Sequence, residues 1–110
     1  MTLDLDSDGL TGKIPSEIGE LINLTDLNLR LNHFTTLPER IGDLNRLEKL
    51  YLSNNQLTTI PDSICNLTNL NWSSQFMNTS YSYIFSNQLC PPYTLCIENY
   101  LGVQDTSNCP

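Results

Sequence analysis

The side chains of this 110-residue chain that could carry chemistry are four cysteines, one histidine and a short run of aspartates. Cys65, Cys90, Cys96 and Cys109 could bind a metal or form two disulfides, for which three pairings exist. No two of them form a C-x-x-C pair and His33 lies far upstream, so the pattern is a poor match to a zinc site. Disulfides are therefore the favoured chemistry, and no cofactor is expected.

Catalysis would have to use His33, because it is the single histidine. No serine or cysteine near it in the sequence has a nucleophile signature, and it falls at a position expected on a solvated rim. Asp4, Asp6 and Asp8 alternate along the chain without a calcium loop of the EF-hand type, so we interpret them as a solvated face. The sequence predicts that the protein is not an enzyme.

The charge balance limits the classes of partner. The net charge is −7, with 5 Lys and Arg against 12 Asp and Glu, which argues against nucleic acid because phosphate binding depends on basic side chains. No apolar run reaches the roughly 20 residues of a membrane span, so membrane insertion is not expected. The acidic first 20 residues do not resemble a signal peptide. Either a targeting segment was removed, or the chain is cytosolic, or it is a fragment.

Leucine, isoleucine and asparagine recur with a period of 23 residues in the first part of the chain. The matched pairs are Leu24 and Leu47, Leu27 and Leu50, Leu29 and Leu52, Asn32 and Asn55, Phe34 and Leu57, Ile41 and Ile64, and Leu44 and Leu67. An earlier unit with one extra residue begins at Leu3 and places Asp8 at the asparagine position. The period predicts stacked units that share one core.

This spacing resembles the leucine-rich repeat family, whose pattern is L-x-x-L-x-L-x-x-N-x-L. The first unit, GLTGKIPSEIG at 9–19, is similar to the plant-type repeat, and the next two are similar to the 23-residue type. The resemblance implies an α/β-type solenoid, with a short parallel β-sheet on the concave side and 3₁₀ or irregular turns on the convex side. Pro15, Pro38 and Pro61 are each expected to open one such turn.

Local patterns fit this architecture. Residues 27–29 and 50–52 alternate between apolar and polar, as a short strand with one buried face requires. Asn32 and Asn55 follow these strands, and their amides are expected to bond to backbone groups of their own and the adjacent coil.

The domain organisation is predicted in three parts. Residues 1–70 form three repeats, residues 71–80 an insertion loop, and residues 81–110 the last repeat and a cysteine-rich cap. The pattern returns at an offset of 32, with Asn87 in the asparagine role. The cap resembles those that close extracellular leucine-rich repeat domains. The chain begins inside a repeat, which indicates a fragment or an exposed sheet edge.

The repeat register leads to a hypothesis for the disulfides. Cys65 occupies the position of Gly19 and Gly42, and Cys96 falls one repeat later, within one residue of the same column. We expect the pairs Cys65–Cys96 and Cys90–Cys109, and with them an extracellular or cell-surface setting, a cytosolic one being the alternative. Four glycosylation sequons give weak support, at Asn23, Asn66, Asn71 and Asn78.

The concave sheet is the surface on which the family usually binds its ligands. Residues beside the inward leucines are expected to project from it, from the acidic Asp4 and Asp6 at one end to an aromatic group at the other. The candidate contact residues for a protein partner are Asp26, Asn28, Arg30, Lys49, Tyr51, Ser53, Tyr81, Tyr83 and Phe85. The alternatives are a carbohydrate-binding or polysaccharide-hydrolase-inhibitor-like protein, with the Tyr81, Tyr83 and Phe85 group stacking on sugars, and a structural spacer of a larger surface protein.

Overall fold

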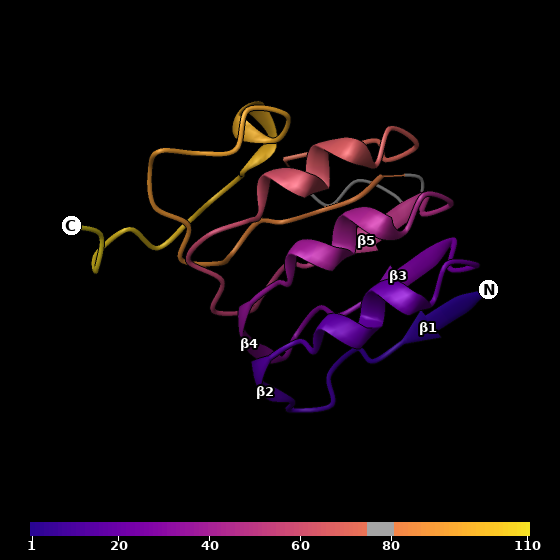
Figure 1. Cartoon of the computed structure of the whole chain (residues 1–110). Coiled ribbons are helices and arrows are strands. Elements are labelled where there is room, and N and C mark those ends of the chain that lie inside the picture. The colour runs from indigo at the N-terminus through magenta and orange to yellow at the C-terminus, as the bar shows by residue number, and fades with distance from the viewer. Residues whose placement is uncertain (75–80) are drawn as a thin grey trace.

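The fold is a stack of short coils, each carrying one strand of a parallel sheet (Figure 1). The computed structural model describes residues 1–74 and 81–110. Strands β1 (Thr2–Asp4), β3 (Asp26–Asn28) and β5 (Lys49–Tyr51) form a three-stranded sheet in the order β1-β3-β5. A parallel bridge between Tyr51 and Tyr83 extends this sheet to the fourth coil. The predicted solenoid is confirmed.

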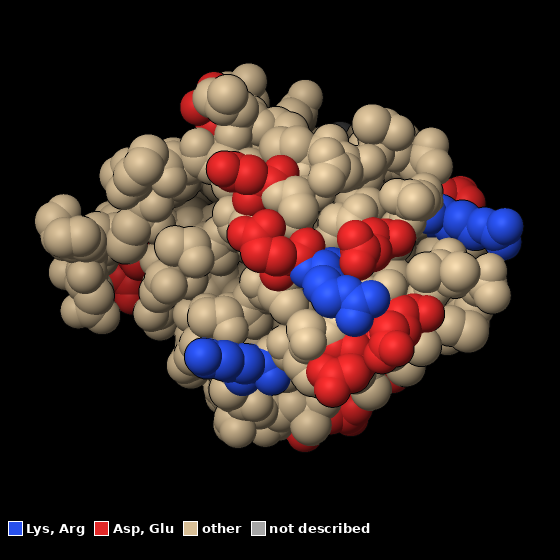
Figure 2. Space-filling view, in the orientation of Figure 1, with Lys and Arg blue, Asp and Glu red and all other residues tan. Residues whose placement is uncertain are grey.

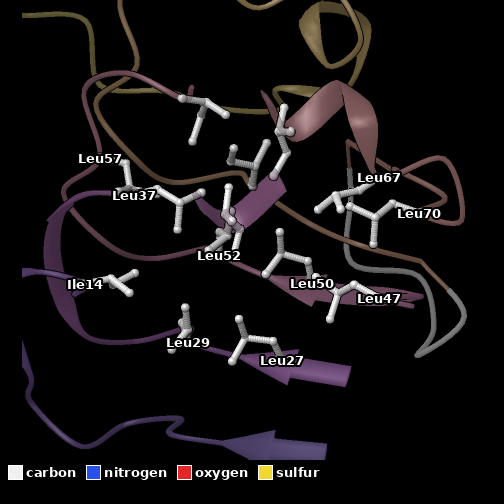
Figure 3. Close-up of a cluster of buried hydrophobic side chains, with 14 of the residues drawn as sticks. Ile14, Leu27, Leu29, Leu37, Leu47, Leu50, Leu52, Leu57, Leu67 and Leu70 are labelled. Atoms are coloured by element: carbon white, nitrogen blue, oxygen red, sulfur yellow. The ribbon is translucent and has the colours of Figure 1, made fainter. Parts of the chain in front are cut away.

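The interior consists of leucine and isoleucine columns that run along the stack. Leu3 pairs with Leu27, and Leu27 pairs with Leu50, so side chains from successive coils lie above one another. Figure 3 shows this cluster, with Leu27, Leu29, Leu50 and Leu52 pointing into the space between the sheet and the opposite side. Burial of each such side chain contributes roughly 1.5–3 kcal/mol, so the columns supply the main stabilisation of the stack.

The side of the stack opposite the sheet is made of 3₁₀ helices. They are η1 (Ser16–Glu20), η2 (Glu39–Asp43), η3 (Asp62–Asn66) and, in the cap, η4 (Glu98–Tyr100). Pro15, Pro38 and Pro61 precede the first three, as predicted, but each occupies the N-cap position in extended conformation rather than the first helical position. The proline carbonyl accepts the first i→i+3 hydrogen bond, for example from the N–H of Ile18 at 3.1 Å.

A second parallel sheet was not predicted. Strands β2 (Thr11–Lys13) and β4 (His33–Thr36) follow the turn at the end of the concave strands and pair with each other, with a register shift at Gly12. Most of their residues are exposed, so hydrophobic alternation gives little signal for them.

A hydrogen-bonded column of side-chain amides joins successive coils. The Oδ1 atom of Asn55 accepts the N–H of Phe34 at 3.1 Å, and its Nδ2 donates to the carbonyls of Leu29 at 2.9 Å and Leu52 at 3.2 Å. The same pattern recurs at Asn32 and Asn87. All three side chains are buried. The prediction that these asparagines serve the backbone of their own and the adjacent coil is confirmed.

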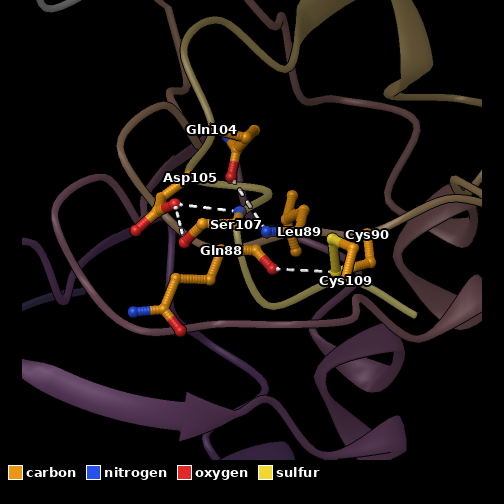
Figure 4. Close-up of a disulfide and its surroundings, with 7 residues drawn as sticks. All are labelled: Gln88, Leu89, Cys90, Gln104, Asp105, Ser107 and Cys109. Carbon is orange, nitrogen blue, oxygen red and sulfur yellow. Dashed lines mark hydrogen bonds between the residues drawn. A yellow bond between two sulfur atoms is a disulfide. The ribbon is translucent and has the colours of Figure 1, made fainter.

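The cap continues this column with a glutamine that sequence analysis missed. The Nε2 of Gln104 donates to the carbonyls of Ile84 at 3.1 Å and Leu101 at 2.7 Å. Its Oε1 accepts the N–H of Leu89 at 3.1 Å, as Figure 4 shows beside the Cys90–Cys109 disulfide. A parallel bridge joins Gln104 to Asn87. Leu101 stands three residues before Gln104, the spacing that precedes each asparagine, and this was the available signal.

A residue in the left-handed backbone region precedes each asparagine of the column, and also Asp8, the equivalent residue of the first coil. The four are Ser7, Leu31, Asn54 and Ser86, with φ between 59° and 61°. Only glycine adopts this region without cost, which is roughly 1–2 kcal/mol for other residues. Each of these residues donates its N–H to a carbonyl of the following coil, at 2.6 to 3.1 Å. The stacking therefore holds the turn in place.

The cap residue equivalent to Ile64 lies one position later than the sequence offset of 32 predicts, because that offset would select Cys96. The N–H of Ile97 donates to Thr94, as that of Ile64 donates to Pro61. Ile97 is buried like Ile64, so it replaces Cys96 as the cap residue equivalent to Ile64. The sequence does not reveal this difference of one residue, because the connection between the fourth strand and the cap does not have the length found in the earlier repeats.

The disulfide Cys65–Cys96 occupies a place where other coils use glycine. A Cβ built on Gly42 would lie 2.6 Å from the Cβ of Ser63 in the next coil, and Gly19 is equally crowded. Cys65 follows in this column, and it bonds to Cys96, with the two Cα atoms 5.7 Å apart. The second disulfide is Cys90–Cys109. Both pairs are those expected from the register.

The first residues of the predicted insertion loop lie along the last strand of the stack. Trp72 forms a parallel bridge with Ser82, whose N–H donates to the carbonyl of Asn71 at 2.6 Å. The N–H of Ser73 donates in turn to Ser82 at 3.0 Å. Residues 75–80 of the insertion lie outside the described residues. The segment at 71–73 therefore covers part of the edge that the last coil presents.

The amide column predicts a large effect from one isosteric change. In Asn55→Asp, the carboxylate cannot donate to the carbonyls of Leu29 and Leu52, and a charge is buried. We expect the free energy of unfolding to fall by at least about 3 kcal/mol at neutral pH, measured by urea denaturation. The exposed Asn45→Asp is the matched control, with a change within about 0.5 kcal/mol. Equal effects of the two changes would contradict the assignment.

The cap disulfide predicts a second effect on stability. Cys65 and Cys96 are 31 residues apart in sequence, and closing a loop of this size contributes roughly 3–4 kcal/mol in the chain-entropy description. The double variant Cys65→Ser, Cys96→Ser should lose this amount in denaturant unfolding while the Cys90–Cys109 disulfide stays intact by mass spectrometry. An unchanged unfolding midpoint would show that the cap does not need the bond.

Candidate functional site

The candidate site is the solvent side of the concave sheet, where parallel pairing aligns side chains in columns. One column contains Asp26 and Lys49, which are paired neighbours. A second runs through Asn28, Tyr51 and Tyr83. The third column consists of Asp6, Arg30, Ser53 and Phe85, one residue after each inward apolar side chain. The strands thus bring together residues from four coils, with neighbours in a column 23 to 32 positions apart in sequence.

The C-terminal end of this surface is aromatic. The rings of Tyr51 and Tyr83 stack with centroids 5.8 Å apart and an interplanar angle of 18°. The ring of Phe85 meets Tyr83 edge-on, also at 5.8 Å and at 68°. Such pairs contribute about 0.5–1.5 kcal/mol beyond their burial, so the rings form a fixed cluster.

Two of the predicted contact residues are not accessible. Tyr83 is 1% exposed because its ring lies between those of Tyr51 and Phe85, and Ser53 is 1% exposed. The prediction that these two side chains project to solvent is wrong, since alternation specifies the face of a strand but not the size of its neighbours. Tyr81 is 37% exposed. The other predicted contact residues are half-buried: Asp26, Asn28, Arg30, Lys49, Tyr51 and Phe85.

Tyr51 is the residue of this surface with a perturbed ionisation. Its pKa is raised above the ordinary value of 10.0, first because burial disfavours the phenolate, and then because of the negative charge of Asp26 and the neighbouring Tyr83 phenol. The phenol is therefore a neutral hydrogen-bonding group at physiological pH.

The convex face has a different character. Figure 2 shows Asp and Glu side chains gathered over the row of 3₁₀ helices, interrupted by a few basic ones. Glu17, Glu39 and Asp62 each stand in the first turn of a 3₁₀ helix. The Nε of Arg40 pairs with Asp43 at 3.1 Å in the same region. Mixed charge with aromatic rings is thus found on the sheet side, and mainly acidic charge on the convex side.

The structure also places the cysteines, the histidine and the aspartates that the sequence offered for metal binding or catalysis. All four cysteines are in disulfides, so no thiolate is left for zinc. His33 is exposed on β4, with its Nδ1 3.4 Å from the Nε2 of Gln56. Asp4 and Asp8 are exposed, and Asp6 is half-buried. Within residues 1–74 and 81–110, no cluster of three metal-ligating side chains is present.

The predicted glycosylation sites differ in how far the structure describes them. Asn23, Asn66 and Asn71 are exposed, and the Oδ1 of Asn23 accepts a hydrogen bond from Arg46 at 3.1 Å. Asn78 lies outside the described residues. Glycosylation at these four positions stays a prediction.

Comparison with known proteins identifies the family. The sequence profile of the leucine-rich repeat matches residues 1–57 and 22–72. The chain belongs to the leucine-rich repeat family. A solved structure of a leucine-rich repeat protein from Leptospira interrogans is 39% identical and has a TM-score of 0.63, with 79% of this chain covered and 20% of that one.

A second leucine-rich repeat structure shows the same fold at lower identity. The BIR2 ectodomain from Arabidopsis thaliana is 24% identical with a TM-score of 0.74, and the match covers 94% of this chain and 54% of the ectodomain. This chain therefore spans about a fifth and about half of the two matched chains. Among curated proteins, none matches closely enough to count as a relative.

The family membership fixes the general class of the protein. Leucine-rich repeat domains are general protein–protein interaction modules, and homologues of this kind are typically non-catalytic. In the described part of the chain, no helix has the length and hydropathy needed to cross a bilayer.

The ionisation of Tyr51 predicts a pH dependence of stability. Because the folded-state pKa is raised, its contribution is complete below pH 10.0 and is lost as the pH rises through the folded-state value. The free energy of unfolding should fall less between about pH 9 and about pH 11 in Tyr51→Phe than in the wild type. Urea denaturation at both pH values measures this. Identical losses in the two proteins would contradict the perturbed ionisation.

Proposed function

We propose that this leucine-rich repeat protein binds a protein partner through its concave sheet. The observation that carries the proposal is the composition of that surface, where Lys49, Asp26 and Arg30 lie beside the stacked rings of Tyr51 and Tyr83. Tyrosine and arginine are the residue types that dominate binding energy at protein interfaces. The predicted contact residues that remain accessible are Asp26, Asn28, Arg30, Lys49, Tyr51 and Phe85, together with Tyr81 at the edge of the sheet.

The rigidity of the surface supports the same proposal. Its side chains stand on strands that are fixed by parallel hydrogen bonds, by the amide column and by aromatic packing. A surface that is already ordered loses less conformational entropy on binding than a loop does. Opposite charges at Asp26 and Lys49 would also orient a partner of matching charge pattern.

We also propose an extracellular or cell-surface location. Two disulfides within 110 residues favour an oxidising compartment. A free-thiol assay on protein taken from its native source tests this. Four titratable thiols would overturn the location, and no thiols would support it.

The two alternatives have less support. A sugar site on Tyr81, Tyr83 and Phe85 does not agree with the geometry, because the central ring, Tyr83, is buried. A spacer role needs no particular surface and gives no reason for an ordered aromatic and charged cluster.

Substitutions on the two faces test the proposal. Proteins captured on the immobilised chain from native surface extract would be purified, and their affinities measured by biolayer interferometry. Lys49→Glu and Tyr51→Ala should each weaken binding by roughly tenfold or more, equal to about 1.4 kcal/mol. Glu39→Lys is the matched charge change on the convex face and should leave the affinity unchanged. The reverse result would overturn the concave assignment.

A further inference from the structure

A groove lined by uncharged residues, among those that the structure describes, lies between the third coil and the cap and touches the edge of the concave sheet at Tyr81. Its volume is about 440 Å³, within the roughly 300–1,000 Å³ range of ligand sites. The described residues that line it include three aromatic side chains, two small polar ones and the surface disulfide. They are Trp72, Tyr81, Tyr100, Thr68, Asn71 and Cys65–Cys96.

None of the described residues that line this groove is charged, although the chain has 12 acidic residues. The two hollows beside Thr59 both include Asp62, and one of them also includes Glu39. A further uncharged hollow, around Leu10 and Phe34 in the first coils, has no tyrosine or tryptophan among its described lining residues. A charged ligand would lose hydration in this groove without gaining an opposite charge. The groove therefore suits a neutral ligand.

The hydrogen-bonding groups of the lining residues indicate which class of neutral ligand the groove could bind. The indole N–H of Trp72 is a donor only, and the hydroxyls of Tyr81 and Tyr100 can donate as well. Aromatic side chains together with such donors match a chain that offers apolar rings and carbonyl acceptors but has no backbone N–H of its own. A proline-rich segment in the polyproline II conformation has these properties.

Both walls of the groove are anchored. The wall at Trp72 is held by hydrogen bonds of its neighbours Asn71 and Ser73 to Ser82, at 2.6 and 3.0 Å. The wall at Tyr100 is held by the N–H of Tyr100, which donates to Ile97 at 2.8 Å, and by the Cys65–Cys96 disulfide. A preformed groove and a ligand that is already extended both reduce the entropy lost on binding.

We propose that this groove is a second binding site, which takes an uncharged proline-rich segment of a partner protein. Tyr100, in η4 and 41% exposed, is the residue most open to such a ligand. Tyr81 is the described lining residue that also belongs to the predicted concave set. The groove is tested at Tyr100 and the concave interface at Lys49 and Tyr51, so either proposal can fail without the other.

The experiment uses Trp72 as the reporter, because it is the single tryptophan of the chain. An octaproline peptide is titrated into the oxidised protein, and the position and intensity of the indole emission are followed. We expect a saturable change, and no change with a glycine–serine peptide of the same length. Tyr100→Ala should weaken binding roughly tenfold, and Tyr100→Phe should weaken it less. Glu39→Lys, on the convex face of the second coil, is the control and should bind octaproline like the wild type.

Three results would overturn the proposal. They are the absence of a saturable change at millimolar octaproline, an unchanged affinity in Tyr100→Ala, and a saturable change with cellohexaose in place of octaproline. Circular dichroism and thermal unfolding of Tyr100→Ala verify that the cap remains folded. The double variant Cys65→Ser, Cys96→Ser provides a second test, because loosening the cap wall should weaken octaproline binding while Trp72 stays in place.

Discussion

The column of buried side-chain amides is the interaction on which the rest of the structure depends. Each coil leaves its strand through a tight turn that points backbone N–H and carbonyl groups into the interior, where no water can pair them. Asn32, Asn55 and Asn87 each satisfy groups of their own coil and of the preceding one, so a coil is complete only when the next is stacked on it. The leucine columns favour burial in general, but the amides fix the register.

The two ends of the stack are treated differently. At the C-terminal end, Gln104 repeats the amide contacts, and the Cys65–Cys96 disulfide joins the cap to the third coil at a position where earlier coils use glycine for close approach. At the other end, Asp8 stands at the amide position and has no N–H to donate when ionised. The cap, the last coil and the segment at 71–73 are thus joined to one another, and their described residues line the neutral groove.

Two surfaces with different chemistry result from one scaffold. The concave sheet presents charge and tyrosine on strands, and its shape follows from the repeat period. The groove beside Trp72 and Tyr100 lies where the period is broken, between the third coil and the cap. In a repeat protein the irregular coils therefore carry geometry that the repeats cannot provide.

The sequence by itself determined the repeat, the inward columns and the 3₁₀ turns after proline, because these depend on spacing that each coil copies from the last. The two disulfide pairs were a hypothesis among three possible pairings, and the structure decided in its favour. Tertiary structure alone decided the second sheet of β2 and β4, the role of Gln104 and the place of Trp72 along the last strand. It also decided the burial of Tyr83 and Ser53, which the sequence had placed on the surface. Alternation in a strand fixes the direction of a side chain, whereas its exposure depends on the neighbours that packing places around it.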